Sequence, residues 1–65
     1  MTTDLEKLRR AFAVMDDTDR AVFARARFDD LTYPEIAADL GITVSEVEGR
    51  MVSAIRHLRD ALEAP

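Results

Sequence analysis

The chain carries few side chains that could perform chemistry, and their spacing does not assemble a catalytic or metal site. It has no cysteine and a single histidine, so disulfides and a Cys/His zinc site are excluded. Five aspartates lie in two short groups without the spacing of a calcium loop, and helix capping and turn formation account for them. With no nucleophile–base pair and no phosphate-cradling glycine loop, we expect no enzyme activity, no cofactor and no small-molecule ligand. The aspartates are Asp16, Asp17, Asp19, Asp29 and Asp30.

Composition and charge indicate one small folded domain over residues 1–65. Hydrophobic residues make up 48% of the chain, which is the content of a folded domain and not of a disordered tail. No apolar run approaches the length of a membrane span, and the charged start MTTDLEKLRR is unlike a signal peptide. We therefore expect a cytoplasmic protein with no membrane partner. The net charge is −4, whereas nucleic-acid-binding proteins usually present a basic face.

Apolar residues recur at helical spacing along the whole chain, which predicts an all-α domain of four helices. The aspartates of residues 16–19 are expected to end the first helix and begin the second, which Phe28 closes. No strand pattern, repeat or linker interrupts this periodicity. The stripes that we expect to face the core are Leu5, Leu8, Phe12 and Met15 in the first helix, Val22, Phe23 and Ala26 in the second, Ile36, Ala37 and Leu40 in the third, and Val44, Val47, Met51, Ala54, Ile55, Leu58 and Leu62 in the fourth.

Three threonine–glutamate pairs at three-residue spacing have the pattern of capping boxes at helix starts. Pro34 falls in the first turn of the third helix, where its missing amide does no harm. Gly41 follows that helix and supplies a left-handed residue that stops it. Pro65 marks the end of the fourth helix. The three pairs are Thr3–Glu6, Thr32–Glu35 and Thr43–Glu46.

The stretch LTYPEIAADLGITVSEVEGRM, residues 31–51, predicts a short helix, a glycine turn and a second helix. Ala37 is small where the two helices must cross closely, and Gly41 accepts a backbone angle that other residues resist. Val47 fills the angle between the helices. This spacing is typical of the DNA-binding helix-turn-helix, here over 32–56, and an ordinary helical hairpin in a small bundle is the alternative.

The order of these features over about residues 5–62 resembles region 4 of the extracytoplasmic-function sigma factors, most closely the iron-citrate-type subgroup. The resemblance is carried by DDTDRAVFARARFDDLTYPEIAADLGITVSEVEGRM and the following AIRHLRDAL. The LuxR-type response-regulator domain shares much of this pattern, but the sequence LTYPEI and the long final helix favour the sigma type. The matching positions are Arg20, Val22, Phe23, Arg27, Phe28, Leu31, Thr32, Tyr33, Glu35, Ile36, Ala37, Leu40, Gly41, Ile42, Val47, Arg50, His57 and Leu58.

The resemblance implies a role in bacterial transcription regulation. Region 4 of such factors places its last helix in the major groove of the −35 promoter element, so double-stranded promoter DNA is the implied partner. Its other face docks on the flap of the RNA polymerase β subunit. Amides at the helix starts would assist the phosphate contacts. Carried onto this sequence, the base-edge candidates are Ser45, Glu46, Gly49, Arg50 and Ser53, and the phosphate candidates are Arg27, Thr32, Tyr33, Thr43 and Arg56.

Two side chains of this region have alternative interpretations. Tyr33 stands in the first turn of the third helix, where a phosphate contact and a packing role are equally expected. His57 lies on the flank of the fourth helix and could act as a pH switch or a DNA contact. For His57 we favour a solvated side chain.

Two departures from the family matter for function. A working sigma factor also needs region 2, which melts the −10 element, and 65 residues leave no room for it. We expect a free-standing protein that cannot direct initiation alone. The face that should meet DNA is also short of cations, because residues 43–53 hold Glu46 and Glu48 against Arg50 alone. A glutamate can accept from cytosine, but phosphates repel it.

The small residues Ser45, Gly49 and Ser53 lie four apart and form a stripe along the fourth helix that would let another helix approach closely. Exposed Val52 fits such a contact. The second hypothesis is therefore a protein-interaction module with weak or lost DNA binding. It would act as a homodimer, or as a decoy for the polymerase flap or an anti-sigma factor. The alternative is that small residues replace cations without consequence.

Overall fold

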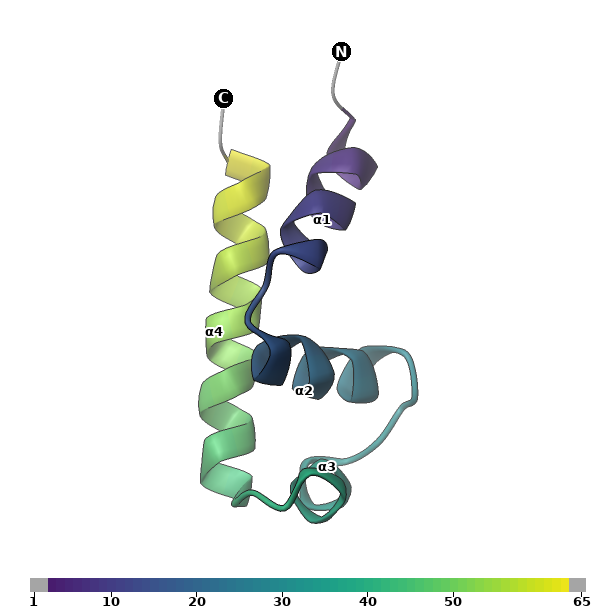
Figure 1. Ribbon diagram of the computed structural model, residues 1–65, viewed down its shortest axis with the longest axis vertical. Coiled ribbons are helices and arrows are strands. Elements are labelled where there is room, and N and C mark those ends of the chain that lie inside the picture. The colour runs from purple at the N-terminus through teal and green to yellow at the C-terminus, as the bar shows by residue number, and fades with distance from the viewer. Residues whose placement is uncertain (1–2, 64–65) are drawn as a thin grey trace.

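The computed structural model describes residues 3–63, and within them it is all-α, as predicted. The longest helix, α4, runs the length of the molecule (Figure 1). α1 lies along the second half of α4, α2 crosses its middle and α3 packs near its start (Figure 1). Pro65, expected to mark the end of α4, lies outside the described residues. The helices are α1 (Asp4–Ala13), α2 (Asp17–Arg27), α3 (Tyr33–Leu40) and α4 (Val44–Glu63).

Side-chain caps begin the helices where the sequence predicts them. The Thr3 hydroxyl accepts from the amide of Glu6 at 3.1 Å, and α1 follows. Asp16 caps α2 by accepting from the amides of Thr18 and Asp19 at 3.0 and 3.3 Å. Gly41 ends α3 with φ +69°, in the left-handed region that favours glycine. These local hydrogen bonds fix the boundaries because the first amides of a helix have no partner within it.

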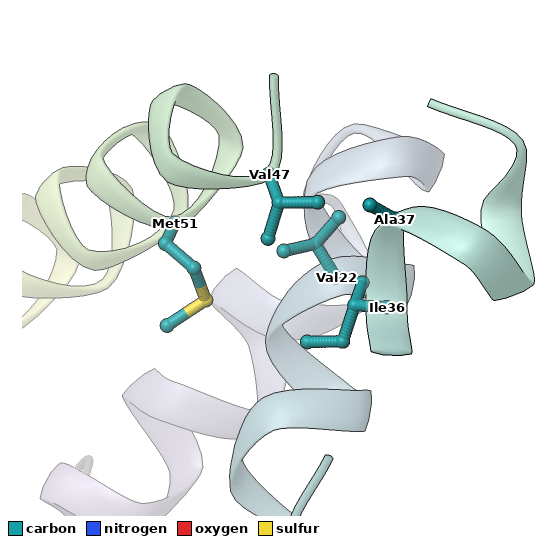
Figure 2. Close-up of a cluster of buried hydrophobic side chains, with 5 residues drawn as sticks. All are labelled: Val22, Ile36, Ala37, Val47 and Met51. Carbon is teal, nitrogen blue, oxygen red and sulfur yellow. The ribbon is translucent and has the colours of Figure 1, made fainter. Parts of the chain in front are cut away.

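The core sits where α2, α3 and α4 meet, and five side chains from these helices gather there (Figure 2). Three of them, Val22, Ile36 and Val47, are fully buried. Tyr33 packs against this cluster and is half-buried, so its packing role is confirmed. Each of the three helices buries a face that it could not bury alone, and this orients α3 relative to α4 as a helix-turn-helix. The five are Val22, Ile36, Ala37, Val47 and Met51.

Four residues predicted to face the core are exposed instead. Leu5 of α1 is 64% exposed, and Val44, Ile55 and Leu62 of α4 are 38%, 42% and 39% exposed. The prediction that these side chains are buried is wrong. Three short helices cannot surround a helix of 20 residues, so only the half of the apolar stripe that faces them is covered. Phe28 closes α2 as predicted, yet it is 71% exposed.

The last carbonyl groups of α1 receive hydrogen bonds from side chains of later helices. Arg20 of α2 donates through Nη1 to the carbonyl oxygens of Ala13 at 2.9 Å and Phe12 at 3.4 Å. His57 of α4, which is half-buried, donates through Nε2 to the carbonyl oxygen of Ala11 at 2.9 Å. These carbonyls have no partner within α1, so the bonds fasten α1 to the rest of the domain. The interpretation of His57 as a solvated side chain is therefore wrong.

None of the helices within residues 3–63 combines the length and the apolar character needed to cross a membrane. α4 has enough residues, but charged side chains recur along it.

Candidate nucleic-acid interface

The two helices of the helix-turn-helix each begin with a reciprocal capping box. At the start of α3, the Thr32 hydroxyl accepts from the Glu35 amide at 3.3 Å, and the Thr32 amide donates to Glu35 Oε1 at 2.9 Å. At the start of α4, Thr43 and Glu46 exchange the same pair of bonds at 3.0 and 3.3 Å. All four side chains are exposed. The predicted DNA contacts Thr32, Thr43 and Glu46 thus lie at the two helix starts, where their polar atoms cap the backbone.

The capping box of α3 also shifts the charge equilibrium of its glutamate. The backbone amide of Thr32, and to a lesser degree its hydroxyl, hydrogen-bond the Glu35 carboxylate and lower the pKa of that side chain below its ordinary value of 4.5. The carboxylate accepts these bonds best when it is ionised. The negative charge therefore stays in place at the helix start, where it also interacts favourably with the helix dipole.

Three of the predicted contact residues are exposed on α4, and no side-chain hydrogen bond or ion pair joins them to other residues of 3–63. Ser45 and Gly49 lie in the first two turns, and Arg56 lies in the fourth. A Cβ placed on Gly49 would meet nothing within 4 Å, so the surface there is open. A double helix or another protein can approach the backbone of α4 closely at this point.

Arg50 and Ser53, also predicted to contact DNA, turn toward the first turn of α2 and bond to aspartates there and at its N-cap. Arg50 Nη1 lies 3.2 Å from Asp19 Oδ1 and 3.4 Å from Asp16 Oδ2. Ser53 Oγ donates to Asp19 Oδ2 at 2.7 Å. The side chain of Asp19 is only 7% exposed, whereas that of Arg50 is 45% exposed. The two aspartates, Arg50 and Ser53 form one hydrogen-bonded cluster, which we call the Asp19 cluster, between α2 and the first half of α4.

The Asp19 cluster changes the electrostatics of the predicted DNA-contacting face. Arg50 is the cation of residues 43–53, and it faces the carboxylates of Asp16, which caps α2, and of Asp19 in α2. Its own helix adds the negative charges of Glu46 and Glu48. One guanidinium cannot neutralise two carboxylates, so the cluster keeps a net negative charge. Phosphate groups approaching this part of α4 meet little positive charge.

Arg27, the remaining predicted phosphate contact, lies at the end of α2 on an apolar groove. Its guanidinium carbon is 6.0 Å from the centre of the Phe23 ring, within the range of a cation–π contact. The other residues that line this groove come from α1, α2 and the second half of α4, such as Leu58.

The groove has a volume of about 540 Å³ and an almost wholly apolar lining. Phe12, Phe23 and Phe28 meet edge to face in it, with ring centres 6.1 to 6.2 Å apart. Two arginines, Arg9 and Arg27, interrupt the apolar lining, and neither forms an ion pair with a carboxylate of residues 3–63. Exposed apolar patches of this kind mark interaction sites on soluble proteins. The lining residues are Leu5, Leu8, Arg9, Phe12, Phe23, Arg27, Phe28 and Leu58.

Sequence reasoning missed the role of Asp19, which it assigned to capping. A signal for it does exist in α4, because Arg50, Ser53 and His57 recur at steps of three and four. They form a polar stripe beside the core stripe of Met51 and Ala54, and such a stripe faces neighbouring helices as well as solvent. Which residues of those helices it meets depends on the packing of distant segments.

Comparison with known proteins gives a single consistent result. The family described as "Sigma-70, region 4" matches residues 5–58. The chain is similar to the ECF RNA polymerase sigma factor RpoE of Cereibacter sphaeroides, with 36% identity over 59 residues. That alignment covers 91% of this chain and 33% of the relative, so the chain spans about a third of the relative's length. No solved structure matches the chain.

Proposed function

This chain belongs to the sigma-70 region 4 family, and from that premise we propose that it is a small bacterial transcription regulator. In this proposal α4 contacts promoter DNA of the −35 type, and the opposite side of the domain contacts RNA polymerase. Domains of this family bind promoter DNA and RNA polymerase and are not enzymes. We place the chain in the iron-citrate-type subgroup of the extracytoplasmic-function factors, acting in the cytoplasm.

The observation that carries the DNA half of the proposal is the exposed start of α4 behind a left-handed glycine turn. In a helix-turn-helix, the first turns of the second helix lie nearest the base edges. Here these turns present Ser45 and the open surface at Gly49. Arg56, further along the same face, is exposed and unpaired within residues 3–63, which suits a phosphate contact.

The polymerase half of the proposal is supported by the apolar groove between α1, α2 and α4. We propose this groove as the docking site for the flap of the polymerase β subunit. Phe28 offers a large exposed ring there, and beside it lie Arg9 and Arg27, which form no ion pair within residues 3–63. An apolar helix with acidic residues along its edge would complement such a surface.

A fluorescence titration of the whole chain with a −35-like duplex tests the DNA half. We expect binding at low salt above that to a scrambled duplex. Arg56→Ala should flatten the salt dependence of the binding constant by about one in log–log slope, because one phosphate contact is lost. Arg10→Ala is the matched control, since it removes the same charge from an exposed position on α1. Equal binding to both duplexes, with equal slopes for the two variants, would contradict promoter recognition.

A protein-interaction module with weak DNA binding is the second candidate, and the paired state of Arg50 favours it. In that case the chain would self-associate, or act as a decoy for the flap or for an anti-sigma factor. Sedimentation velocity distinguishes the self-associating version. A dimer that Gly49→Leu dissociates would support it, whereas a monomer at all concentrations, unchanged by that substitution, would count against it.

A further inference from the structure

We propose that Asp19 is a positioning residue that holds Arg50 away from DNA and so sets the affinity of the domain. The inference rests on the proposed function, because it requires the start of α4 to face DNA. It concerns a contact between α2 and α4 within the chain, and it predicts that removing an acidic side chain unmasks a cation already present.

The geometry of the Asp19 cluster supports this role. Arg50 uses one nitrogen, Nη1, for Asp19 at 3.2 Å and for Asp16 at 3.4 Å. Ser53 donates to the other oxygen of Asp19 at 2.7 Å, so both oxygens of that carboxylate accept a bond from α4. Two of the five predicted base-edge contacts, Arg50 and Ser53, are thus bonded to one carboxylate of α2.

Burial makes this cluster stronger than an ion pair between exposed side chains. The Asp19 side chain is 7% exposed, so water screens its charge little and replaces a lost partner poorly. If Arg50 turned to DNA, Asp19 would keep only the hydrogen bond from Ser53 and would be left buried with its charge uncompensated. The exchange is therefore unfavourable for Arg50, and the guanidinium stays with α2.

Other ion pairs of the domain do not have this effect. Arg20 pairs with Asp17, and Arg25 pairs with Asp39, but neither arginine lies on α4. The side chain of Asp17 is 93% exposed, and it lies in the same turn of α2 as Asp19 without contacting Arg50. Asp17 therefore provides a control with equal charge, nearly equal position and no link to Arg50.

The test is a salt series of DNA titrations on the full chain carrying Asp19→Asn or Asp17→Asn. Asparagine keeps the size of the aspartate and can still accept from Ser53. With Asp19→Asn we expect about a tenfold higher affinity near 0.1 M salt and a log–log salt slope steeper by about one, because Arg50 becomes available to DNA. Asp17→Asn should change the affinity by less than about twofold, since at this salt an exposed charge is largely screened.

The double variant Asp19→Asn/Arg50→Ala separates release of Arg50 from loss of negative charge. If the inference holds, Arg50→Ala abolishes the gain that Asp19→Asn produces, so the double variant binds DNA no more tightly than the wild-type chain does. A gain that persists without Arg50, or that Asp17→Asn matches, overturns it. A weaker affinity of Asp19→Asn also overturns it, because Asp19 would then be presenting Arg50 to DNA.

Failure of the inference differs from failure of the proposed function. If the wild-type chain binds the duplex and Asp19→Asn leaves the affinity unchanged, only the inference is lost. If no variant binds any duplex, the DNA half of the proposed function falls with it. Should Asp19→Asn fail to fold by circular dichroism, Asp16→Asn replaces it, because asparagine is an equally good helix cap. It removes one of the two carboxylates from Arg50, and a smaller gain in the same direction is then required.

Discussion

Gly41 and Gly49 border the predicted DNA-contacting turns and have opposite conformational demands. Gly41 has φ +69°, whereas Gly49 lies inside α4, and a Cβ at either position would meet nothing within 4 Å. We expect Gly41→Ala to lower the free energy of unfolding by about 1 kcal/mol, because a side chain disfavours the left-handed region. Gly49→Ala should raise it by up to about 1 kcal/mol, because alanine has the higher helix propensity. Urea unfolding of both variants measures the difference.

The contrast within this pair is the control, since both substitutions add the same methyl group to an open surface. Loss of stability in both variants would contradict the assignment of Gly49 as a residue without structural need for glycine. In that event, Gly49 would be needed for the fold, and its lack of a side chain would not indicate close approach by DNA.

The capping box at Thr32 and Glu35 predicts a pH dependence. The pKa of Glu35 is lowered in the folded chain relative to 4.5, so the box contributes stability above that pH and loses it as the pH falls through the lowered value. We expect Glu35→Gln to reduce the melting temperature at neutral pH. The reduction should be smaller at a pH far below 4.5, where wild-type Glu35 also becomes neutral. Glu48→Gln, at an exposed position on α4 without a cap, should leave the melting temperature unchanged at both pH values.

At this scale, what the sequence predicts depends on how far apart the partners are. The capping boxes and Gly41 were predictable because each bond joins residues three to five apart. Asp19 meets residues 31 and 34 positions away, and His57 meets Ala11, 46 positions away. No local pattern identifies such partners, so the bonds that hold Arg50 and Ser53 followed only from the packing of α2 against α4.

Among the elements, α1 depends most on side chains that come later in the chain. Arg20 donates to the carbonyls of Phe12 and Ala13, and its side chain is 34% exposed. We expect Arg20→Met to lower the free energy of unfolding by about 1 kcal/mol, the usual worth of such a bond when water partly competes for it. Amide hydrogen exchange should increase most in α1. Arg59→Met, at an exposed position on α4, should change stability by less than about 0.5 kcal/mol.

A uniform increase of exchange in all helices after Arg20→Met would contradict a local role in fastening α1.

Helix positions themselves were predictable, because periodicity and caps agree in every element. The degree of burial of each stripe was not predictable, since Ile55 and Leu62 lie at one edge of the apolar stripe of α4, outside the part that the other helices cover. The apolar pattern shows which side of a helix can be buried, and the number of neighbours decides how much of that side is.

In the whole molecule, the candidate DNA-binding surface and the apolar groove lie at different positions along α4. α3 and the start of α4 lie at one end of the molecule, and α1 lies along the second half of α4 (Figure 1). Most of the predicted DNA contacts are on α3 and the first half of α4, while the groove is lined by α1, α2 and Leu58 and also holds Arg27. We therefore predict that the two proposed interactions can be lost independently. Phe28→Ser should weaken binding of a polymerase flap fragment at least about tenfold, because large aromatic side chains within an apolar contact are typical hot spots. The same substitution should leave DNA binding unchanged.

Val14→Ser is the matched control for this prediction. Val14 is 72% exposed and Phe28 is 71% exposed, so both substitutions remove an exposed apolar side chain, but Val14 does not line the groove. Biolayer interferometry with the flap fragment and a DNA titration on the same preparations give both affinities, and thermal melts show whether each variant is folded. If both serine variants weaken flap binding equally, the groove is not the docking site. If Phe28→Ser weakens DNA and flap binding together while the fold is intact, the two surfaces are coupled through α4 and are not independent.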